Sequence, residues 1–430
     1  MISTAYINIW KHRAGAIAWD DSTGVGSFEF EPSFLKNNLD ISPLKMPVNI
    51  PSGKIFSFPE LRSSNSFRGL PGLLADMLPD RYGNALINAW LARHGRPQNS
   101  MNPVEILCFI GKRGMGAIEI EPAFPKGSES AGKVEIDELV RIADDILSGR
   151  KEFSARLSED EEKAMSDILK MGTSPAGARA KVLIAFNPST GEVRSGQADA
   201  PKGFSQWLLK FDGVTDAQFG TSRGYGRVEM AYHLMAKDAG IEMTDCRLLE
   251  EKGRAHFMTQ SFYRKPGNIK VHMQSFFAMQ HFDFNDINSF AYEQLFETMR
   301  ALGLPYPQAE QLFRRMVFNV LARNCDDHTK NFAFLMTEDG NWRLSPAFDL
   351  CHSYRPGSDW VSRQSLSVNG KRQNITRDDF LLVAKQMNIK KAPAIVSDIN
   401  RIVSNWIEYA ELTNVKTDLK DSIYKTLIKL

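Results

Sequence analysis

The chain has 430 residues, of which 43% are hydrophobic and 24% are charged, the composition of an ordinary globular protein. Its formal net charge is +2, so no global basic field predicts binding to nucleic acid or to an anionic membrane. No run approaches the roughly 18 apolar residues of a membrane span, and no signal peptide is recognised at the N-terminus. The four cysteines lack metal-ligand or CxxC spacing, which predicts reduced thiols and a cytoplasmic location.

Residues 1–122 are predicted to form a β-rich N-terminal domain. Short runs in which apolar and polar residues alternate are separated by turn residues, a pattern typical of antiparallel strands. Strands are expected at residues 5–10, 14–19, 26–30 and 114–120. A helical segment is expected over residues 70–93, with a break at Pro79. The Pro-, Gly- and Ser-rich residues 122–132 then predict a linker.

The next region, residues 133–262, is predicted to carry a small sheet with helices around it. Helices are expected at residues 134–149, 160–170 and 227–239, and strands at residues 179–186, 206–211, 246–251 and 255–260. The segment 172–178, just before the first of these strands, is rich in small residues. Such residues allow backbone N–H groups to approach phosphate oxygens, although a loop with only two glycines is more often an ordinary loop.

Lys210 interrupts the apolar strand at residues 206–211. A buried ammonium group requires a carboxylate or another anion beside it. Glu229 lies near the start of the following helix, where it is able to pair with Lys210. Kinases use a strand lysine and a helix glutamate in this way to hold phosphates. The alternative is a lysine facing solvent from an edge strand and a glutamate on the surface.

Residues 263–430 are predicted to be mostly helical. A helix is expected at residues 312–321, strands at 331–336 and 342–344, and further helices from residue 376 onward. The polar stretch 323–331 lies between the first helix and the first strand, and Asp349 follows the second strand. Helix, polar loop, hairpin and aspartate is the order found in the catalytic lobe of a kinase.

Asp326, Asn331 and Asp349 are the set of side chains that phosphoryl transfer requires. The five-residue spacing from Asp326 to Asn331 matches that of kinase catalytic loops. Asp326 is predicted to orient the attacking hydroxyl and accept its proton, while Asn331 and Asp349 bind Mg²⁺. This spacing alone arises by chance roughly once in a chain of this length. The order of loop, lysine, glutamate, hinge and aspartates along the chain supports the kinase interpretation.

These motifs resemble those of the HipA family of bacterial serine/threonine kinases, the toxin half of HipBA toxin–antitoxin modules. Residues 66–90, with Leu-Pro-Asp at 78–80, look like the family's N-terminal domain motif, and residues 109–118 look like that domain's closing strand. Residues 174–181 look like its Gly-rich loop. Residues 326–332 and 345–349 look like its catalytic and metal motifs. The resemblance covers nearly the whole chain.

The resemblance implies ATP as the phosphoryl donor, Mg²⁺ as its metal and autophosphorylation of Ser174. It also implies that Lys210 holds the phosphates, with Lys181 as a second contact. The residues expected to touch the nucleotide are Ala176, Gly177, Ala178, Arg179, Ala180, Lys181, Lys210, Gln260, Ser261, Phe262, His328, Lys330, Asn331, Phe348 and Asp349.

The expected fold class is α+β, a kinase-like bilobal fold with an antiparallel-sheet N-lobe, a helical C-lobe and an additional β-rich N-terminal domain. The expected domains are residues 1–122, 133–262 and 263–430. The expected activity is that of a serine/threonine protein kinase acting as a toxin on a protein substrate. The expected partner is a small helix-turn-helix antitoxin like HipB, through which operator DNA is reached. A small-molecule phosphotransferase and a catalytically silent scaffold that binds a repressor are the alternatives.

Overall fold

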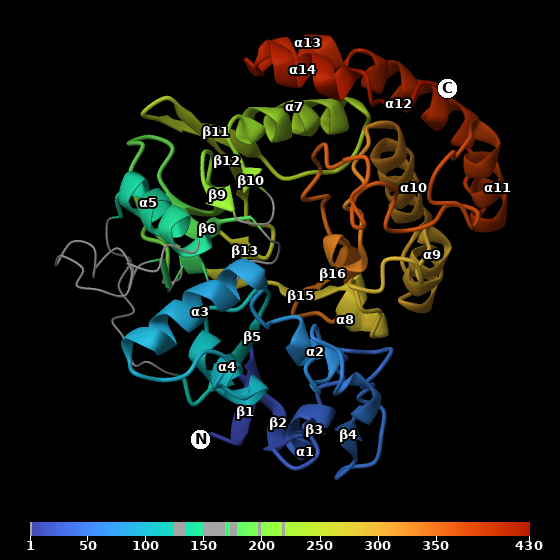
Figure 1. Cartoon of the computed structure of the whole chain (residues 1–430). Helices are drawn as coiled ribbons and strands as arrows, with labels where there is room; N and C mark the ends of the chain where they lie inside the picture. The colour runs from blue at the N-terminus through green and yellow to red at the C-terminus, as the bar shows by residue number, and fades with distance from the viewer. Residues whose placement is uncertain are drawn as a thin grey trace.

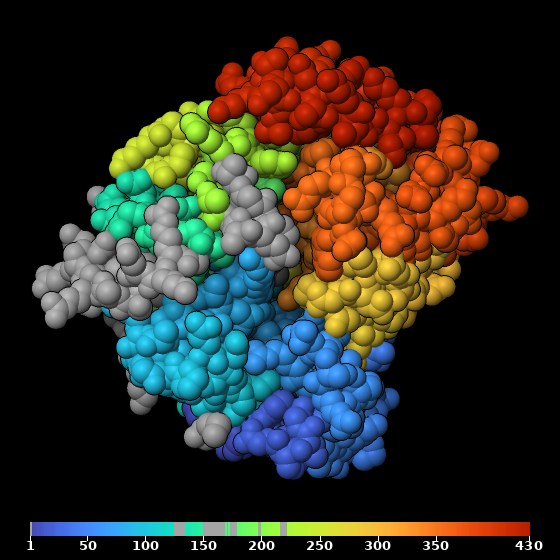
Figure 2. Space-filling model, in the orientation of Figure 1, coloured from blue at the N-terminus to red at the C-terminus, as the bar shows by residue number. Residues whose placement is uncertain are grey.

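The computed structural model describes residues 2–123, 134–148, 168–169, 171–172, 179–196, 199–216 and 220–430. Figure 1 shows an N-terminal unit in blue, a sheet with flanking helices in green, and a helical part that runs from yellow to red. In the space-filling view of Figure 2, the blue unit lies beneath both of the other parts. No helix in the described part of the chain is long and apolar enough to cross a membrane. All four cysteines are free thiols.

The N-terminal unit is a five-stranded antiparallel sheet in the order β4-β3-β2-β1-β5. Its strands are β1 Thr4–Ile9, β2 His12–Asp20, β3 Val25–Phe30, β4 Ile55–Ser57 and β5 Ile118–Glu121. Along β1 buried and less buried residues alternate, so one face of the sheet forms the core. The helices beside it are α1 Pro32–Leu35, η1 Pro59–Leu61, α2 Gly72–Ala75, α3 Arg81–Arg93 and α4 Pro103–Ile110.

The prediction that residues 109–118 form the closing strand of the N-terminal unit is wrong. Phe109 and Ile110 end helix α4, and the closing strand of the unit begins only at Ile118. The helix forms because Asn102 and Glu105 make a capping box at its start. All eight residues of α4 are buried, so its apolar run has no polar face to show a helical period.

The second sheet is also five-stranded and antiparallel, in the order β11-β12-β8-β6-β7. Its strands are β6 Lys181–Phe186, β7 Val193–Ser195, β8 Ser205–Lys210, β11 Cys246–Glu251 and β12 Arg254–Gln260. The short strands β9 Thr215–Asp216 and β10 Gly220–Thr221 and the helices α5 Ile136–Leu147 and α7 Tyr225–Asp238 accompany it. The helix expected at residues 160–170 and the linker at 122–132 fall mostly outside the described residues.

The helical part begins with β13 Arg264–Lys265, β14 Ile269–Lys270 and β15 His272–Ser275. Strand β15 pairs with β16 Ala333–Met336, which pairs with β17 Trp342–Leu344. The helices are α8 Phe276–Gln280, α9 Tyr292–Ala301, α10 Tyr306–Leu321, η3 Thr329–Asn331, α11 Arg377–Met387, α12 Ala392–Ser404, α13 Trp406–Leu412 and α14 Thr417–Tyr424. The strand expected from residue 331 therefore starts later, because residues 329–331 form a turn of 3₁₀ helix.

Two apolar cores organise these elements. One runs without a break from the N-terminal unit, for example Phe28, through α5 into the second sheet at Leu209. The other joins α9, α10 and α12 with helix α7, whose Tyr232 packs on Trp406. Helix α7 lies on the second sheet but belongs to the core of the helical part. The limits of the three expected domains stay a prediction.

Candidate active site

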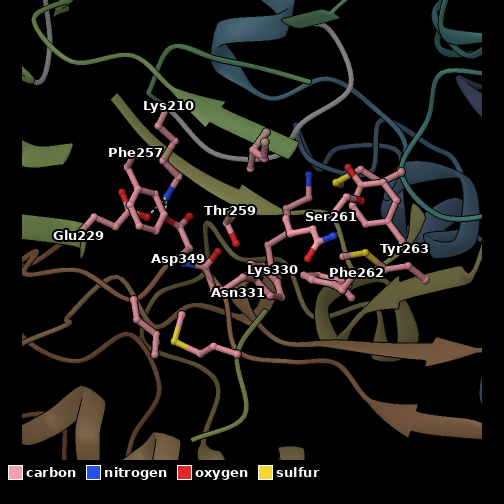
Figure 3. A pocket seen from close by; sticks show the side chains of 18 of the residues that line it. Lys210, Glu229, Phe257, Thr259, Ser261, Phe262, Tyr263, Lys330, Asn331 and Asp349 are labelled. Atoms are coloured by element: carbon pink, nitrogen blue, oxygen red, sulfur yellow. Dashed lines mark hydrogen bonds and ion pairs between the residues drawn. The ribbon is translucent and has the colours of Figure 1, made fainter. Parts of the chain in front are cut away.

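A cleft lies where the second sheet, the polar loop after α10 and the N-terminal unit meet. It encloses about 860 Å³ of space, its open mouth included, within the usual range for a small-molecule site. Figure 3 shows the side chains that line it. Those of the sheet and the segment after it are Leu208, Lys210, Phe257, Thr259, Gln260, Ser261, Phe262 and Tyr263. Lys330, Asn331, Phe348 and Asp349 line it from the helical part.

Lys210, the last residue of β8, lies at the charged end of the cleft. Its ammonium group contacts Glu229 Oε1 and lies 2.5 Å from Asp349 Oδ1, and the three side chains point toward one another in Figure 3. Burial acts to lower the pKa of Lys210, but the Asp349 and Glu229 carboxylates outweigh it and raise the pKa. Burial acts to raise the pKa of Asp349, and the Lys210 ammonium nevertheless holds it below its usual range. Lys210 and Asp349 are therefore both ionised at neutral pH.

Local backbone features bring these three side chains together. Gly226 stands where α7 approaches β12, and a Cβ there would collide with the carbonyl oxygen of Ala255. Glycine therefore lets the start of α7 lie close to the sheet, and Glu229 follows one turn later on the same helix. Asp349 has a φ of +57°, in the left-handed region that few non-glycine residues adopt. This conformation sets the direction of its carboxylate at the end of the Phe348–Asp349 pair.

The loop between α10 and β16 contains two adjacent aspartates with different environments. Asp327 is buried and accepts hydrogen bonds from Tyr292 Oη at 2.7 Å and from Ser365 N at 2.7 Å. Burial raises the pKa of Asp327 to about 6, against the effect of these hydrogen bonds. The side chain of Asp326 is 37% exposed. Asp327 therefore holds the loop in place, and Asp326 is the one open to a reactant.

Asn331 and Asp326 are joined within this loop. The Asn331 Nδ2 donates to the Asp326 carbonyl oxygen at 2.7 Å, which fixes the amide and leaves its oxygen able to accept. His328 caps the short turn with its Nδ1, 3.3 Å from Lys330 N. Burial lowers the pKa of His328, so its ring is neutral at pH 7. His328 is not among the residues that line the cleft.

Asp326 has a partner that the sequence did not reveal. The indole Nε1 of Trp360 donates to Asp326 Oδ1 at 2.7 Å, and His328 Nε2 lies 3.7 Å from the same oxygen. Trp360 is 34 residues from Asp326 in the sequence and lies in the segment between β17 and α11. No spacing rule connects the two residues, so only the folded structure shows the contact.

The oxygen donors that face the cleft suit a magnesium ion bound together with phosphate. Asn331 offers an amide oxygen, and Asp349 offers a carboxylate whose Oδ1 is the atom that contacts Lys210. Amide and carboxylate oxygens are ligands that Mg²⁺ prefers, and Mg²⁺ commonly takes only one or two protein ligands beside phosphates and water. No group of three or more His, Cys, Asp or Glu side chains able to hold a metal occurs in the described part of the chain. Asn331 and Asp349 fit a metal ion that takes its remaining ligands from phosphates and water.

The predicted phosphate loop is only partly described. Ser174, Ala176, Gly177 and Ala178 lie outside the described residues. Arg179 is exposed, and its guanidinium carbon lies 4.3 Å from the centre of the Tyr225 ring. Ala180 and Lys181 are described, and both side chains are buried; their contact with a nucleotide stays a prediction. Lys181 does not line the cleft.

The predicted hinge follows β12 and borders the cleft. The backbone N–H of Ser261 donates to Gln206 O at 2.9 Å, and the rings of Phe262 and Phe348 lie 5.4 Å apart. Lys330 enters the cleft with its ammonium 5.3 Å from the centre of the Phe277 ring. These side chains give an apolar wall beside the charged cluster, which suits a ligand with a flat ring and a polyanionic tail.

The N-terminal unit also contributes to the cleft, which the sequence did not predict. Asp76 and Met115 line it. Asp76 is buried and accepts from both the backbone N–H and the hydroxyl of Ser275, each at 2.7 Å. Burial raises the pKa of Asp76, and Lys330 opposes this shift. The sequence of residues 70–80 does not show that Asp76 lines the cleft, because no local pattern indicates which part of the molecule this segment packs against.

Comparison with known protein families agrees with this architecture. A model of the HipA N-terminal domain matches residues 5–121, and a model of the HipA-like C-terminal domain matches residues 173–406. The chain belongs to the HipA family. The second match covers more than half of the chain and includes every residue of the charged cluster.

A solved HipA structure has the same fold. The HipA protein of Shewanella oneidensis MR-1, determined in a complex with HipB and operator DNA, matches with a TM-score of 0.70 and 15% identity over 98% of this chain and 94% of that chain. The Helicobacter pylori proinflammatory kinase CtkA matches with a TM-score of 0.33 and 15% identity over 52% of this chain and 88% of that chain. A search of curated proteins found no match. The predicted family and the predicted α+β, kinase-like bilobal fold are thus confirmed.

Proposed function

We propose that this HipA-family chain is a serine/threonine protein kinase that uses ATP and Mg²⁺ and acts as the toxin of a toxin–antitoxin pair. The contact of Lys210 with both Glu229 and Asp349, at the edge of an open cleft, carries the proposal. Buried ion pairs also occur at structural contacts of this chain, so the position of this cluster at an open cleft is what points to a ligand. A cluster of this kind beside a cleft is therefore best explained by a polyanionic ligand.

Each residue around the cleft has its own proposed role in phosphoryl transfer. Lys210 holds phosphate oxygens, and Glu229 keeps its ammonium group in position. Asn331 and Asp349 would hold Mg²⁺, which when bound neutralises charge on the β- and γ-phosphates. Asp326, on the exposed side of the loop, orients the acceptor hydroxyl and takes its proton. The segment 260–262 and Phe348 supply the wall for the base.

The proposed partner is a small helix-turn-helix antitoxin of the HipB kind. The Shewanella oneidensis HipA was determined with HipB and operator DNA, and we propose an equivalent complex here, with DNA bound through the antitoxin. The proposed acceptor is a Ser or Thr hydroxyl on a cellular protein. A cytoplasmic location accords with a target inside the cell.

Autophosphorylation of Ser174 is part of the proposal. A phosphoserine adds about −1.5 to −2 charges, and at the phosphate loop such a group would compete with the phosphates of ATP. We therefore expect phospho-Ser174 protein to transfer phosphate poorly. Mass spectrometry of protein incubated with ATP and Mg²⁺ detects the modification, and Ser174→Ala serves as its control. Transfer activity without phosphate at Ser174 would remove this switch and leave the kinase.

Two substitutions test the proposed roles. Asp326→Ala is expected to keep ATP binding and abolish transfer, because the proton acceptor is lost while Asn331 and Asp349 remain. Asp349→Ala is expected to lose both. Calorimetry with ATP and Mg²⁺ measures binding, and transfer from radiolabelled ATP to the chain itself and to casein measures activity. The control is Asp339→Ala, in the exposed turn between β16 and β17. Wild-type transfer by Asp326→Ala would show that the role assignment is wrong.

A further inference from the structure

The contact between Trp360 and Asp326 points to a role for the segment between β17 and α11. This inference rests on the proposed phosphoryl transfer and concerns how its proton acceptor is held. The indole Nε1 of Trp360 donates to Asp326 Oδ1 at 2.7 Å. Among the described residues, the second contact to this carboxylate, from His328 Nε2 at 3.7 Å, ends on the same oxygen. The two contacts therefore leave Oδ2 as the oxygen able to meet an acceptor hydroxyl.

The segment that carries Trp360 is anchored to the catalytic loop on both sides of the tryptophan. Before it, the Ser353 hydroxyl accepts from Asp326 N at 3.1 Å and donates to Asn324 Oδ1 at 2.9 Å. After it, Gln364 Nε2 donates to Asp327 Oδ2 at 3.0 Å. The backbone around Trp360 is closed on itself by a bond from Arg355 N to Val361 O at 3.1 Å. A side chain held in this way has little freedom to leave the carboxylate.

Aromatic contacts fix the plane of the indole as well. The Trp360 ring lies 6.0 Å from the His328 ring and 6.4 Å from the Phe284 ring, each in an edge-to-face arrangement. His328 and Phe284 are themselves 5.4 Å apart. Aromatic pairs prefer this geometry and resist rotation out of it. The N–H direction is thus determined by packing around the ring and does not depend on the hydrogen bond alone.

We propose that Trp360 is a positioning residue for phosphoryl transfer, which fixes the Asp326 carboxylate so that Oδ2 receives the proton of the acceptor hydroxyl. In that step the acceptor O–H bond breaks and its proton goes to Oδ2. The acceptor oxygen forms a bond to the γ-phosphorus, and the bond from the γ-phosphorus to the bridging oxygen breaks, with its electron pair leaving on ADP. A carboxylate free to rotate about its Cβ–Cγ bond would present the right oxygen only part of the time.

The test replaces the donor while keeping the ring. Trp360→Phe retains an aromatic side chain beside His328 and Phe284 but has no N–H group. We expect its kcat for phosphate transfer to casein to fall by roughly 10- to 100-fold, the usual effect of losing a hydrogen bond to a charged group. The KM for ATP is expected to stay within about twofold, because the nucleotide side of the cleft is untouched. Trp360→Ala, which loses ring and donor, is expected to fall further.

Trp342→Phe is the matched control. The Trp342 Nε1 donates to Asp40 O at 3.1 Å and not to a residue of the catalytic loop, so the same chemical change is expected to leave kcat unaltered. A spectroscopic measurement adds a readout independent of turnover. The indole ¹⁵N–H resonance of Trp360, assigned as the one missing in Trp360→Phe, is expected to move upfield in Asp326→Asn, because an amide oxygen is a weaker acceptor than a carboxylate.

The outcomes separate this inference from the function on which it rests. If the wild-type protein transfers phosphate and Trp360→Phe does so at the same rate, the positioning role is wrong and the kinase stands. An increase in kcat for Trp360→Phe would overturn the inference in the opposite direction, since the contact would then block the acceptor. If the wild-type protein transfers no phosphate at all, the proposed function fails first, whatever the resonance of Trp360 does.

Discussion

Two lysines on adjacent strands, Lys210 on β8 and Lys181 on β6, are direct partners in the ladder yet serve different regions. Lys210 meets Glu229 and Asp349 at the edge of the open cleft. Lys181 is 2% exposed and lies 3.8 Å from Asp80 of the N-terminal unit. One lysine therefore faces a place where a ligand can enter, and the other faces a contact between two parts of the fold.

The electrostatics of the two lysines differ accordingly. The carboxylates beside Lys210 outweigh burial and raise its pKa. Burial lowers the pKa of Lys181, and Asp80 offsets this only in part. Burial also raises the pKa of Asp80 to about 6, against the effect of Lys181. At the cleft, the charge of Lys210 is balanced by Glu229 and Asp349, at a place that a ligand is able to reach. The pair of Lys181 and Asp80 instead joins the Leu-Pro-Asp motif to the second sheet.

The boundary between the N-terminal unit and the rest of the chain contains further buried polar contacts that, like the pair of Lys181 and Asp80, join two parts of the fold. Asp76 accepts from Ser275, His281 Nε2 accepts from Gly72 N at 3.0 Å, and His272 Nε2 contacts Ile41 O at 2.9 Å. The apolar core is continuous across part of the same boundary. Residue types that suggest chemistry in a sequence, such as Lys, Asp and His, here hold two parts of one fold together.

The largest effect is expected from breaking the buried pair at the boundary. Asp80→Asn keeps an acceptor for Gly83 N, which Asp80 Oδ1 now caps at 2.7 Å, but removes the carboxylate that lies 3.8 Å from the Lys181 ammonium. We expect the free energy of unfolding to fall by about 3 kcal/mol or more, the usual cost of removing one partner of a buried ion pair. Urea denaturation followed by circular dichroism measures it.

The double variant Asp80→Asn/Lys181→Met sharpens this prediction. Removing both charges is expected to recover most of the lost stability, because a methionine fills the space of the lysine without a charge. Losses that simply add in the double variant would show that the two residues do not act as a pair.

The next effect concerns catalysis by the two lysines. Lys210→Met is expected to lower the transfer rate by roughly 10²-fold or more, because a preorganised positive charge at the phosphates is lost. Lys181→Met is expected to cost far less in rate. Steady-state transfer from radiolabelled ATP compares them, with Lys252→Met, an exposed lysine paired with Asp137, as the control. An inactive Lys181→Met beside an active Lys210→Met would reverse the assignment.

Glu229→Gln is expected to have a smaller effect, about tenfold on kcat. Lys210 keeps its charge and its contact with Asp349, but the glutamine no longer offers a carboxylate to orient it. Glu250→Gln on the neighbouring strand β11, whose side chain is 59% exposed, is the matched control. A loss as large as that of Lys210→Met would mean that the glutamate has a role beyond orientation.

Much of the fold and of the site followed from local patterns in the sequence. The strands around Lys210 and the helix with Glu229 were predicted from apolar periodicity, and the polar loop and the hairpin from turn residues. The predicted pair of Lys210 and Glu229 is present in the structure. The contact of Lys210 with Asp349 was not predicted, because no local pattern relates residues 139 positions apart.

The remaining features depend on contacts that have no local pattern. Asp76 and Met115 line the cleft because the N-terminal unit packs against it, which no spacing indicates. Trp360 reaches Asp326 from a loop without regular structure. Lys181 looked like a phosphate contact because it follows the small-residue loop, and only the fold shows Asp80 beside it. Tertiary packing decides such contacts, and a single sequence does not record it.

The effect that is smallest near neutral pH, and that grows only on acidification, is expected from two histidines at the boundary. Burial lowers the pKa of His272 to about 4 and that of His281 to about 3, whereas a histidine in an unfolded chain titrates near 6.5. Between pH 6.5 and about 4 the unfolded state therefore binds more protons than the folded state. The contribution of each histidine to stability is fully present above pH 6.5 and is lost as the pH falls, by about 1.4 kcal/mol per pH unit.

Replacing one of these histidines isolates its share of the slope. His281→Gln keeps an acceptor for the Gly72 N–H group but has no group that titrates, so the loss of stability between pH 6.5 and 5 is expected to become less steep. His12→Gln, at an exposed position in the N-terminal unit, is expected to leave the slope unchanged. Urea midpoints measured at half-unit pH steps compare the three proteins. An unchanged slope in His281→Gln would show that its ring is protonated in the folded state as readily as in the unfolded chain. The contact between His281 and Gly72 would then not depend on a neutral imidazole.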